Sequence, residues 1–307
     1  MKGLELSRAF FEEYGKPMLK SEFGQYFYRM AIGLVGQGSE CYGFDDEISL
    51  DHDYEVGFCI WLTEEDEKLF GFKLFRAYSK LPKEYKGIKL TQSGAFSSNR
   101  KGVHIIKEFY SFYTGTGEAP KDNYQWLSIP EVYLAEATNG EVFVDNLGEF
   151  SRIREEIKKG MPEDVRLKKL ASAVFHMAQS GQYNYLRCLA HNEKAAAAIA
   201  LTEFCQNTAH AVFLLNREYM PYYKWSFRAM KGLKILSEVS NQIESLLTSP
   251  YESKINSAII EEISQMIIME IKKQNLSDRN DSYLEPYAYC INNKIKDGNL
   301  RNSPVML

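Results

Sequence analysis

Residues 36–62 read GQGSECYGFDDEISLDHDYEVGFCIWL, and they place a Gly-Ser pair and an Asp-x-Asp pair between two apolar segments. The preceding segment, FYRMAIGLVG, has the character of a buried strand that ends at glycines. The following one, DYEVGFCIWL, is rich in β-branched and aromatic residues and predicts a second strand. This strand–loop–strand pattern predicts that the first part of the chain folds around a sheet.

The polar residues of this stretch suit a metal and a phosphate. Asp51 and Asp53 are two residues apart, so on a strand both point to one face, with His52 on the other. Paired carboxylates suit Mg²⁺, which adds water and phosphate oxygens. Gly38 lets backbone approach a phosphate, and Ser39 supplies a hydroxyl. Together they predict metal-assisted nucleotidyl or phosphoryl transfer, whereas a bare Asp-x-Asp pair is common by chance and is compatible with the polar end of an ordinary strand.

The hydrophobic pattern changes near residue 150. Before it, an amphipathic helix at 4–22, the two strands above and a short strand, EVFVD, indicate mixed structure. After it, helical patterns dominate, at 162–179, 193–218, 227–247 and 252–274. We therefore predict an α+β catalytic domain at 1–150, with a mixed sheet flanked by helices, and an all-α helical bundle at 151–307. The last twelve residues, KDGNLRNSPVML, are expected to form a loosely held tail.

Composition limits the class of protein. The 307 residues carry a formal net charge of −4, which gives no electrostatic footprint for sequence-independent nucleic-acid binding. The five cysteines are scattered without a C-x-x-C pair, which favours reduced thiols. Neither a signal peptide nor an apolar run long enough for a bilayer is evident, so a cytoplasmic protein without membrane contact is expected. The oligomeric state stays open.

Three blocks of sequence together resemble one family. They read GSECYGFDDEISLDHD at 38–53, WLSIPEVYLAEATNGEVFVDNLGEF at 126–150, and LLNREYMPYYKW at 214–225. The first resembles the Gly-Ser…Asp-x-Asp signature of the nucleotidyltransferase (DNA polymerase β-like) superfamily. The three in order are similar to the uncharacterised bacterial family DUF4037, over roughly residues 1–230. The plan also resembles that of aminoglycoside and lincosamide nucleotidyltransferases, in which a helical domain covers the acceptor.

The resemblance implies roles for individual residues. Gly38 and Ser39 would hold the phosphates of ATP or another nucleoside triphosphate, and Asp51 and Asp53 would ligate Mg²⁺. In the superfamily a third acid often completes the metal site. Here the candidates are Glu108 and Asp145, although Asp145 also has the position of a helix cap. If no third acid is present, a catalytically inactive nucleotide-binding or regulatory protein is the alternative.

Three residues of the second half are further candidates. Lys224, among the aromatics of PYYKW, would contact the phosphates, and so would Arg217; the alternatives are a surface lysine packed on an aromatic ring and an arginine at a helix C-terminus. Glu203 lies on an apolar helix and is a candidate general base, or else a half-buried acid paired to a lysine or arginine.

The expected function is therefore that of a Mg²⁺-dependent nucleotidyltransferase. It would move a nucleoside monophosphate, AMP from ATP in the first instance, onto a hydroxyl or amine of a small-molecule acceptor bound between the domains. In-line attack on the α-phosphorus would release pyrophosphate. Besides the inactive alternative, a transferase that modifies a protein or an RNA remains open.

Overall fold

The structure is a computed structural model that describes residues 1–306 except 47–55, 90–99, 251 and 253. Asp51 and Asp53 therefore lie outside the described residues, as does His52. The chain divides into two compact units, of which the first comprises Met1–Gln125 and Ile129–Lys159 and the second Trp126–Ser128 and Gly160–Leu307. The boundary predicted at residue 150 falls in the first turn of α8, a helix that belongs to the first unit.

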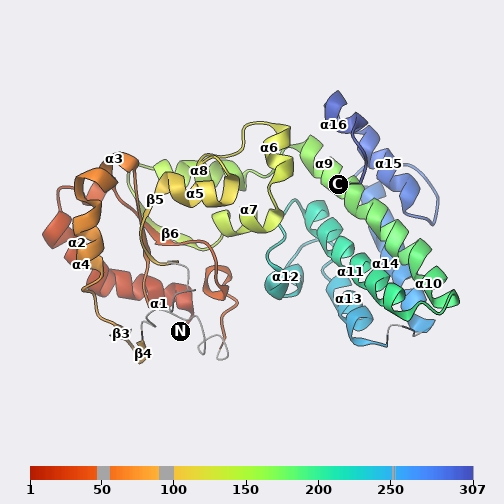
Figure 1. Ribbon diagram of the computed structural model, residues 1–307, viewed down its shortest axis with the longest axis horizontal. Helices are drawn as coiled ribbons and strands as arrows, with labels where there is room; N and C mark the ends of the chain where they lie inside the picture. The colour runs from red at the N-terminus through yellow and green to blue at the C-terminus, as the bar shows by residue number, and fades with distance from the viewer. Residues whose placement is uncertain (47–55, 90–99, 251, 253, 307) are drawn as a thin grey trace. The chain divides into compact units, whose positions relative to one another are not determined.

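The first unit alternates helices with short strands (Figure 1). A continuous helical stretch opens it, with a π-helical turn at Phe11–Gly15 inside the helix predicted at 4–22. In chain order its elements are α1 (Gly3–Phe10), α2 (Lys16–Phe23), β1 (Ala31–Leu34), β2 (Cys59–Leu62), α3 (Glu64–Asp66), α4 (Phe72–Tyr78), β3 (Glu84–Tyr85), β4 (Ile88–Lys89), β5 (Gly102–Ile105), α5 (Ile106–Thr114), the start of α6 (Asn123–Ser128), α7 (Glu131–Thr138), β6 (Glu141–Asp145) and α8 (Glu149–Lys158).

Four strands form the main sheet in the order β5-β2-β1-β6. The strand β1 is antiparallel to both neighbours, and β2 is parallel to β5. Gly33 pairs with Cys59 of β2, and Cys59 pairs with Gly102 of β5. Antiparallel and parallel pairs in one sheet make it mixed, as expected. Both strands predicted around the Gly-Ser loop are confirmed over β1 and over the described end of the second one, β2.

Each face of the sheet packs against helices. Alternate residues of β2 point to opposite faces, as the two-residue period of a strand requires. Ile60 and Leu62 join a core with the apolar residues of α1, α2 and α4. On the other face the Trp61 ring stacks on Phe150 of α8 with ring centroids 4.0 Å apart, and it also contacts Phe109 of α5. Burial of these aromatic rings on both faces fixes the register of the strands.

One end of the sheet gathers four backbone segments. The register places residues that follow β1 beside those that precede β2, β5 and β6. Gly102 N–H donates to the Phe58 carbonyl, and Gly140 N–H donates to the Cys41 carbonyl. The Gly-Ser loop therefore lies at the same sheet end as Phe58, five residues after Asp53.

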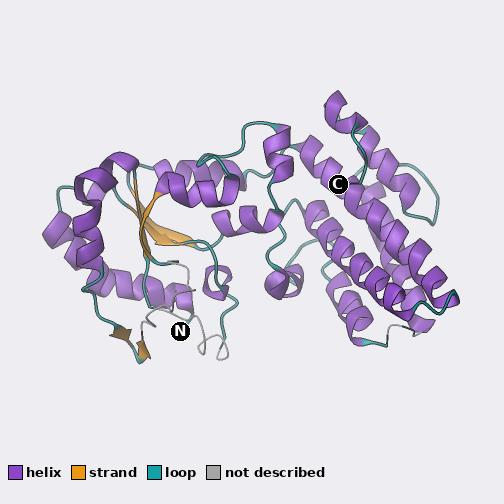
Figure 2. Cartoon of the chain, viewed as in Figure 1, coloured by secondary structure: helices purple, strands orange, loops and turns teal. Residues whose placement is uncertain are grey.

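The second unit is helical throughout its described residues, and Figure 2 draws its elements as helices and loops. Its helices are the end of α6, then α9 (Glu163–Met177), α10 (Leu186–Ala190), α11 (Lys194–Asn216), α12 (Tyr223–Met230), α13 (Val239–Thr248), α14 (Lys254–Lys273), α15 (Glu285–Asn293) and α16 (Gly298–Asn302). A π-helical segment, Ala178–Tyr185, joins α9 to α10. The longest helix, α11, packs against α9, α13 and α14.

Two expectations about this unit are wrong. The helix predicted at 227–247 is interrupted, because the segment between α12 and α13 contains Leu236 in a left-handed conformation with a φ of 59°. The C-terminal segment is not a loose tail. Its Leu300 is 1% exposed, and the buried Lys168 ammonium donates to the Ser303 carbonyl at 2.9 Å. Asp164 also accepts from the Lys296 and Asp297 N–H groups.

A mixed sheet with many helices makes the protein α+β, as predicted from the sequence. None of its helices is both long and apolar enough to span a bilayer, as far as the described residues go. Its five cysteines are free thiols, three of them buried.

Candidate functional site

The loop between β1 and the short 3₁₀-helix Ser39–Tyr42 has the backbone of a glycine-dependent turn. Gly36 and Gly38 have φ values of 119° and 118°, where side chains are rarely accommodated. A Cβ on Gly38 would lie 2.3 Å from the Glu40 carboxylate and 3.0 Å from the Arg100 guanidinium. Ser39 begins the 3₁₀-helix and is 9% exposed. The Gly38 backbone therefore carries no side chain and lies directly against charged groups.

Asn139 holds this loop in place from 103 residues away. Its side-chain oxygen accepts from Gly36 N–H at 2.8 Å, and its amide nitrogen donates to the Gly36 carbonyl at 2.7 Å. Arg154 of α8 donates in turn to the carbonyls of Asn139 and Gly140. Two reciprocal hydrogen bonds satisfy both backbone groups of Gly36, so the loop is fixed before any ligand binds.

Charged groups meet beneath Gly38. Glu40 and Lys101 form an ion pair at 3.5 Å, with side chains only 5% and 7% exposed. The Arg100 guanidinium lies beside them, near the Gly38 Cα. Side chains of both signs therefore lie next to the Gly-Ser loop. Glu40, Arg100 and Lys101 were not predicted as site residues from the sequence.

A cavity of about 250 Å³ adjoins the loop within the first unit. The end of β1 and the start of α5 form its walls, and both apolar rings and polar groups line it. Its lining residues are Val35, Gly36, Gln37, Arg100, His104, Ile105, Glu108, Phe109, Phe112 and Tyr113. A concave, largely apolar space with a few convergent polar groups is the usual form of a small-molecule site.

His104 contributes an imidazole to this cavity. It lies on β5, opposite Trp61, and its Nε2 makes no hydrogen bond within the part of the chain that the structure describes. Burial lowers the pKa of His104 from 6.5 to about 4, so the ring is neutral at pH 7. A buried polar atom without a hydrogen bond is unusual in a folded protein, and this marks His104 as a candidate ligand-binding residue.

The depressed pKa of His104 predicts an acid-sensitive first unit. The pKa of His104 is lower in the folded than in the unfolded state. The contribution of its neutral form to the free energy of unfolding is therefore fully present above pH 6.5 and is lost as the pH falls toward 4. The 2.5-unit difference corresponds to at most about 3 kcal/mol. Urea denaturation of wild type and His104→Gln between pH 7.5 and 4 measures it. Wild type should lose more unfolding free energy than the variant, and parallel pH profiles would contradict the prediction.

Glu136 of α7 is a buried acid on the other side of the loop. It is 8% exposed, and the Gln37 side chain hydrogen-bonds its carboxyl group, while its Oε2 has no partner within the described chain. Burial raises its pKa, against the smaller opposing effect of Gln37. Glu136 was missed because it lies in an ordinary helical pattern.

The two candidates for a third metal acid have different positions. Asp145 lies at the opposite end of the sheet from the Gly-Ser loop, since it pairs with Ala31 at the start of β1. Its carboxylate accepts from Gly148 N–H and Ser151 N–H, so the alternative role of helix cap is confirmed. Glu108 is exposed on α5 and lines the cavity.

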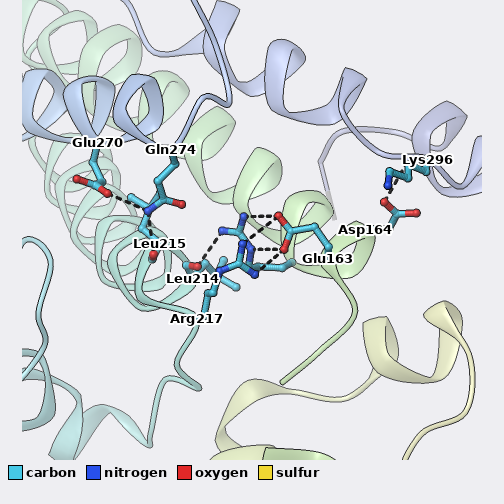
Figure 3. A network of polar contacts seen from close by, with 9 residues as sticks. Glu163, Asp164, Leu214, Leu215, Arg217, Glu270, Gln274 and Lys296 are labelled. Atoms are coloured by element: carbon cyan, nitrogen blue, oxygen red, sulfur yellow. Dashed lines mark hydrogen bonds and ion pairs between the residues drawn. The ribbon is translucent and has the colours of Figure 1, made fainter. Parts of the chain in front are cut away.

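Arg217 and Lys224 lie in the second unit. Arg217 follows α11 in a left-handed conformation with a φ of 59°, and its guanidinium donates to both oxygens of Glu163 (Figure 3). Glu163 is also bound by Arg166, which is the main reason that its pKa falls to about 2. Lys224 is exposed in the first turn of α12. Phosphate contacts by Arg217 and Lys224 stay predictions.

Glu203 lies on α11 with its side chain 46% exposed, and its carboxylate is 3.4 Å from Nδ1 of His176. The polar neighbour is therefore a histidine, rather than the lysine or arginine that the sequence suggested as an alternative. The pair lies within the second unit. A role of Glu203 as general base stays a prediction.

The residues present fit a phosphate better than they fit a complete metal centre. The Gly-Ser loop offers a glycine backbone without a side chain, a serine and the neighbouring Arg100 guanidinium. Groups of three metal-ligating side chains are absent from the described residues. A Mg²⁺ ion would therefore depend on Asp51 and Asp53, which those residues do not include.

The chain thus has an α+β unit, in which Asn139 holds the Gly-Ser loop by hydrogen bonds, followed by a helical unit. Comparison with known proteins supports the sequence resemblance over part of the chain. Residues 126–226 match the family described as "Domain of unknown function (DUF4037)", which confirms the predicted resemblance over that segment. The chain is also similar to the crystal structure of a nucleotidyltransferase-like protein from Exiguobacterium sibiricum 255-15, with 9% identity, a TM-score of 0.37, and 86% of this chain and 81% of that chain covered. No curated protein matches the sequence.

Proposed function

We propose that the protein is a Mg²⁺-dependent nucleotidyltransferase that moves a nucleoside monophosphate, AMP from ATP in the first instance, onto a hydroxyl or amine of a small-molecule acceptor. The single observation that carries the proposal is the Gly-Ser loop. Asn139 holds it by two hydrogen bonds, and it lies beside the Arg100 guanidinium at the sheet end where β2 starts. Preorganised donors and charge at a phosphate are what such transfer requires.

Each site residue has its own role in the proposed reaction. Gly38 and Ser39 would bind phosphate oxygens, helped by Arg100, and Asp51 and Asp53 would hold Mg²⁺. A metal held there would supply charge neutralisation at the transferring phosphate. The bond from the α-phosphorus to the acceptor forms as the bond to pyrophosphate breaks. Lys224, Arg217 and Glu203 belong to the same proposal as phosphate ligands and general base.

Titration calorimetry with ATP tests the proposal. We expect binding in Mg²⁺ to be roughly tenfold or more tighter than in EDTA, since the metal bridges carboxylates and phosphates. Pyrophosphate release should accompany turnover in the presence of a metabolite extract. Equal affinity with and without metal, and no pyrophosphate, would instead support the second candidate.

That second candidate is a nucleotide-binding protein without catalysis. The observation that favours it is the position of Asp145, which caps α8 at the far end of the sheet and so cannot complete a metal site at the loop. Of the two predicted third acids, Glu108 then remains, because it lines the cavity beside the loop. Glu108→Gln should reduce turnover in the active case.

A further inference from the structure

The cavity beside Gly36 has the features of a site for a planar ring. Phe109 and Phe112 line it from α5, and Phe112 is 58% exposed although it is a large aromatic side chain. Gly36 lines it from the chain after β1 and packs against α5, since a Cβ there would lie 3.0 Å from the Tyr113 hydroxyl. The exposed Phe112 ring in the cavity wall offers a face on which a flat group can stack.

Neighbouring rings hold Phe112 in place. Its ring centroid lies 4.9 Å from that of Tyr113 and 5.7 Å from that of Tyr133, in edge-on and tilted arrangements. Tyr113 is 5% exposed, so this cluster is anchored in the core. An exposed ring fixed by its neighbours loses little conformational entropy when a ligand stacks on it.

The polar groups that line the cavity indicate which substituents a bound ring would carry at its edge. His104 lines the cavity with an imidazole that is neutral at pH 7, and its buried Nε2 has no partner in the described chain. Glu108 presents an exposed carboxylate, which in its ionised form only accepts hydrogen bonds. An acceptor at the rim favours a ring that carries an amino group.

The cavity adjoins the residues proposed to bind phosphate. Gly36 and Gln37 line it, and Gly38 and Ser39 follow directly along the loop. A ligand with a ring in the cavity and phosphates at Gly38 would thus occupy adjacent parts of one loop. A nucleotide has this arrangement of groups.

We propose that this cavity binds the amino-bearing purine base of the nucleotide, stacked on Phe112 with its amino edge toward Glu108 and His104. The assignment rests on the proposed function for its phosphate half. Binding of the base does not depend on the metal, so it can be measured separately with a nucleoside that has no phosphates.

Calorimetric titration with adenosine in EDTA tests the base site alone. Wild type should bind adenosine, and it should bind purine riboside, which lacks the amino group, more weakly. Phe112→Ala should weaken adenosine binding by roughly tenfold or more, because stacking on an aromatic ring contributes strongly to base binding. Phe112→Tyr should retain it. Phe75→Ala is the matched control, since Phe75 is 57% exposed on α4 and does not line the cavity.

Several results would overturn the proposal. They are absence of adenosine binding up to its solubility limit, equal binding by Phe112→Ala and wild type, equal affinity for purine riboside and adenosine, and an effect of Phe112→Ala confined to the KM for the acceptor. The two proposals fail separately. Adenosine binding that depends on Phe112, without any nucleotidyl transfer, keeps the base site and removes the enzyme. Transfer with a KM for ATP that Phe112→Ala leaves unchanged keeps the enzyme and removes the base site.

Discussion

Replacing Asp51 by Asn should lower the rate of pyrophosphate release from ATP by about a thousandfold or more. The substitution keeps the size of the side chain and removes one negative ligand charge from the proposed Mg²⁺ site. Loss of a metal contact that stabilises the transferring phosphate costs several kcal/mol of barrier, and each 1.4 kcal/mol is a factor of ten in rate. A coupled pyrophosphate assay at saturating Mg²⁺ measures the effect, with a metabolite extract as the source of acceptor.

The control for this substitution is Asp278→Asn, which changes the same chemical group at an exposed position of the second unit. It should turn over like wild type. Circular dichroism of both variants should match wild type, so that a loss of rate reports on the site and not on folding. Wild-type turnover by Asp51→Asn would remove the metal role of this residue and with it the nucleotidyltransferase assignment.

Replacing Asn139 by Ala should destabilise the first unit and weaken nucleotide binding together. The Gly36 N–H and carbonyl each lose a partner at 2.8 and 2.7 Å, and an unsatisfied buried backbone group costs about 1–3 kcal/mol. Because the loop is partly open to water, we expect a loss of about 2–4 kcal/mol in the free energy of unfolding. Urea denaturation measures the stability, and calorimetry measures the Kd for ATP.

Asn302→Ala provides the comparison, because Asn302 is exposed at the end of α16 in the second unit. It should change neither quantity by more than about 0.5 kcal/mol. If Asn139→Ala unfolds at the same urea concentration as Asn302→Ala, the two hydrogen bonds do not hold the loop, and preorganisation of the Gly-Ser turn is no longer an explanation for phosphate binding.

The strands around the Gly-Ser loop were predictable because the first is a short apolar run that ends at glycines and the second is rich in β-branched and aromatic residues. The segment GVHIIKEFYSFYTG also has strand character that changes to helix spacing, and it forms β5 and α5. The β3–β4 hairpin was missed. Its turn is Lys86–Gly87, in which both residues have positive φ values, and lysine is an uncommon residue at such a position.

The long-range hydrogen bonds that hold the loop segments of the site in place could not be predicted from the sequence. Asn139 and Gly140 predict the end of a helix, and α7 does end before them, but a local pattern cannot show that Asn139 binds Gly36. Asp45 belongs to an acidic triplet that suggests a solvated loop. It is instead 4% exposed and accepts from the N–H of Gly3, at the start of α1. Contacts of this kind depend on chain segments that are distant in sequence.

The start of α7 shows a similar limit. Ser128-Ile129-Pro130-Glu131 predicts a serine cap, yet Ser128 is the last residue of α6, and Pro130 precedes α7 as its N-cap. The N-cap of α6 is Asp122, whose carboxylate accepts from Tyr124 N–H and Gln125 N–H. Because α6 ends at Ser128 and α7 starts at Glu131, the sequence alone indicates a boundary here without showing that both sides of it are helical.

A crystal structure with a nonhydrolysable ATP analogue and Mg²⁺ tests the central claim most directly. We predict Mg²⁺ bound by the carboxylates of Asp51 and Asp53, phosphate oxygens at Gly38 and Ser39, and the base in the cavity beside Phe112. A nucleotide bound elsewhere on the chain, or one bound at the loop with no metal at the two aspartates, would contradict it.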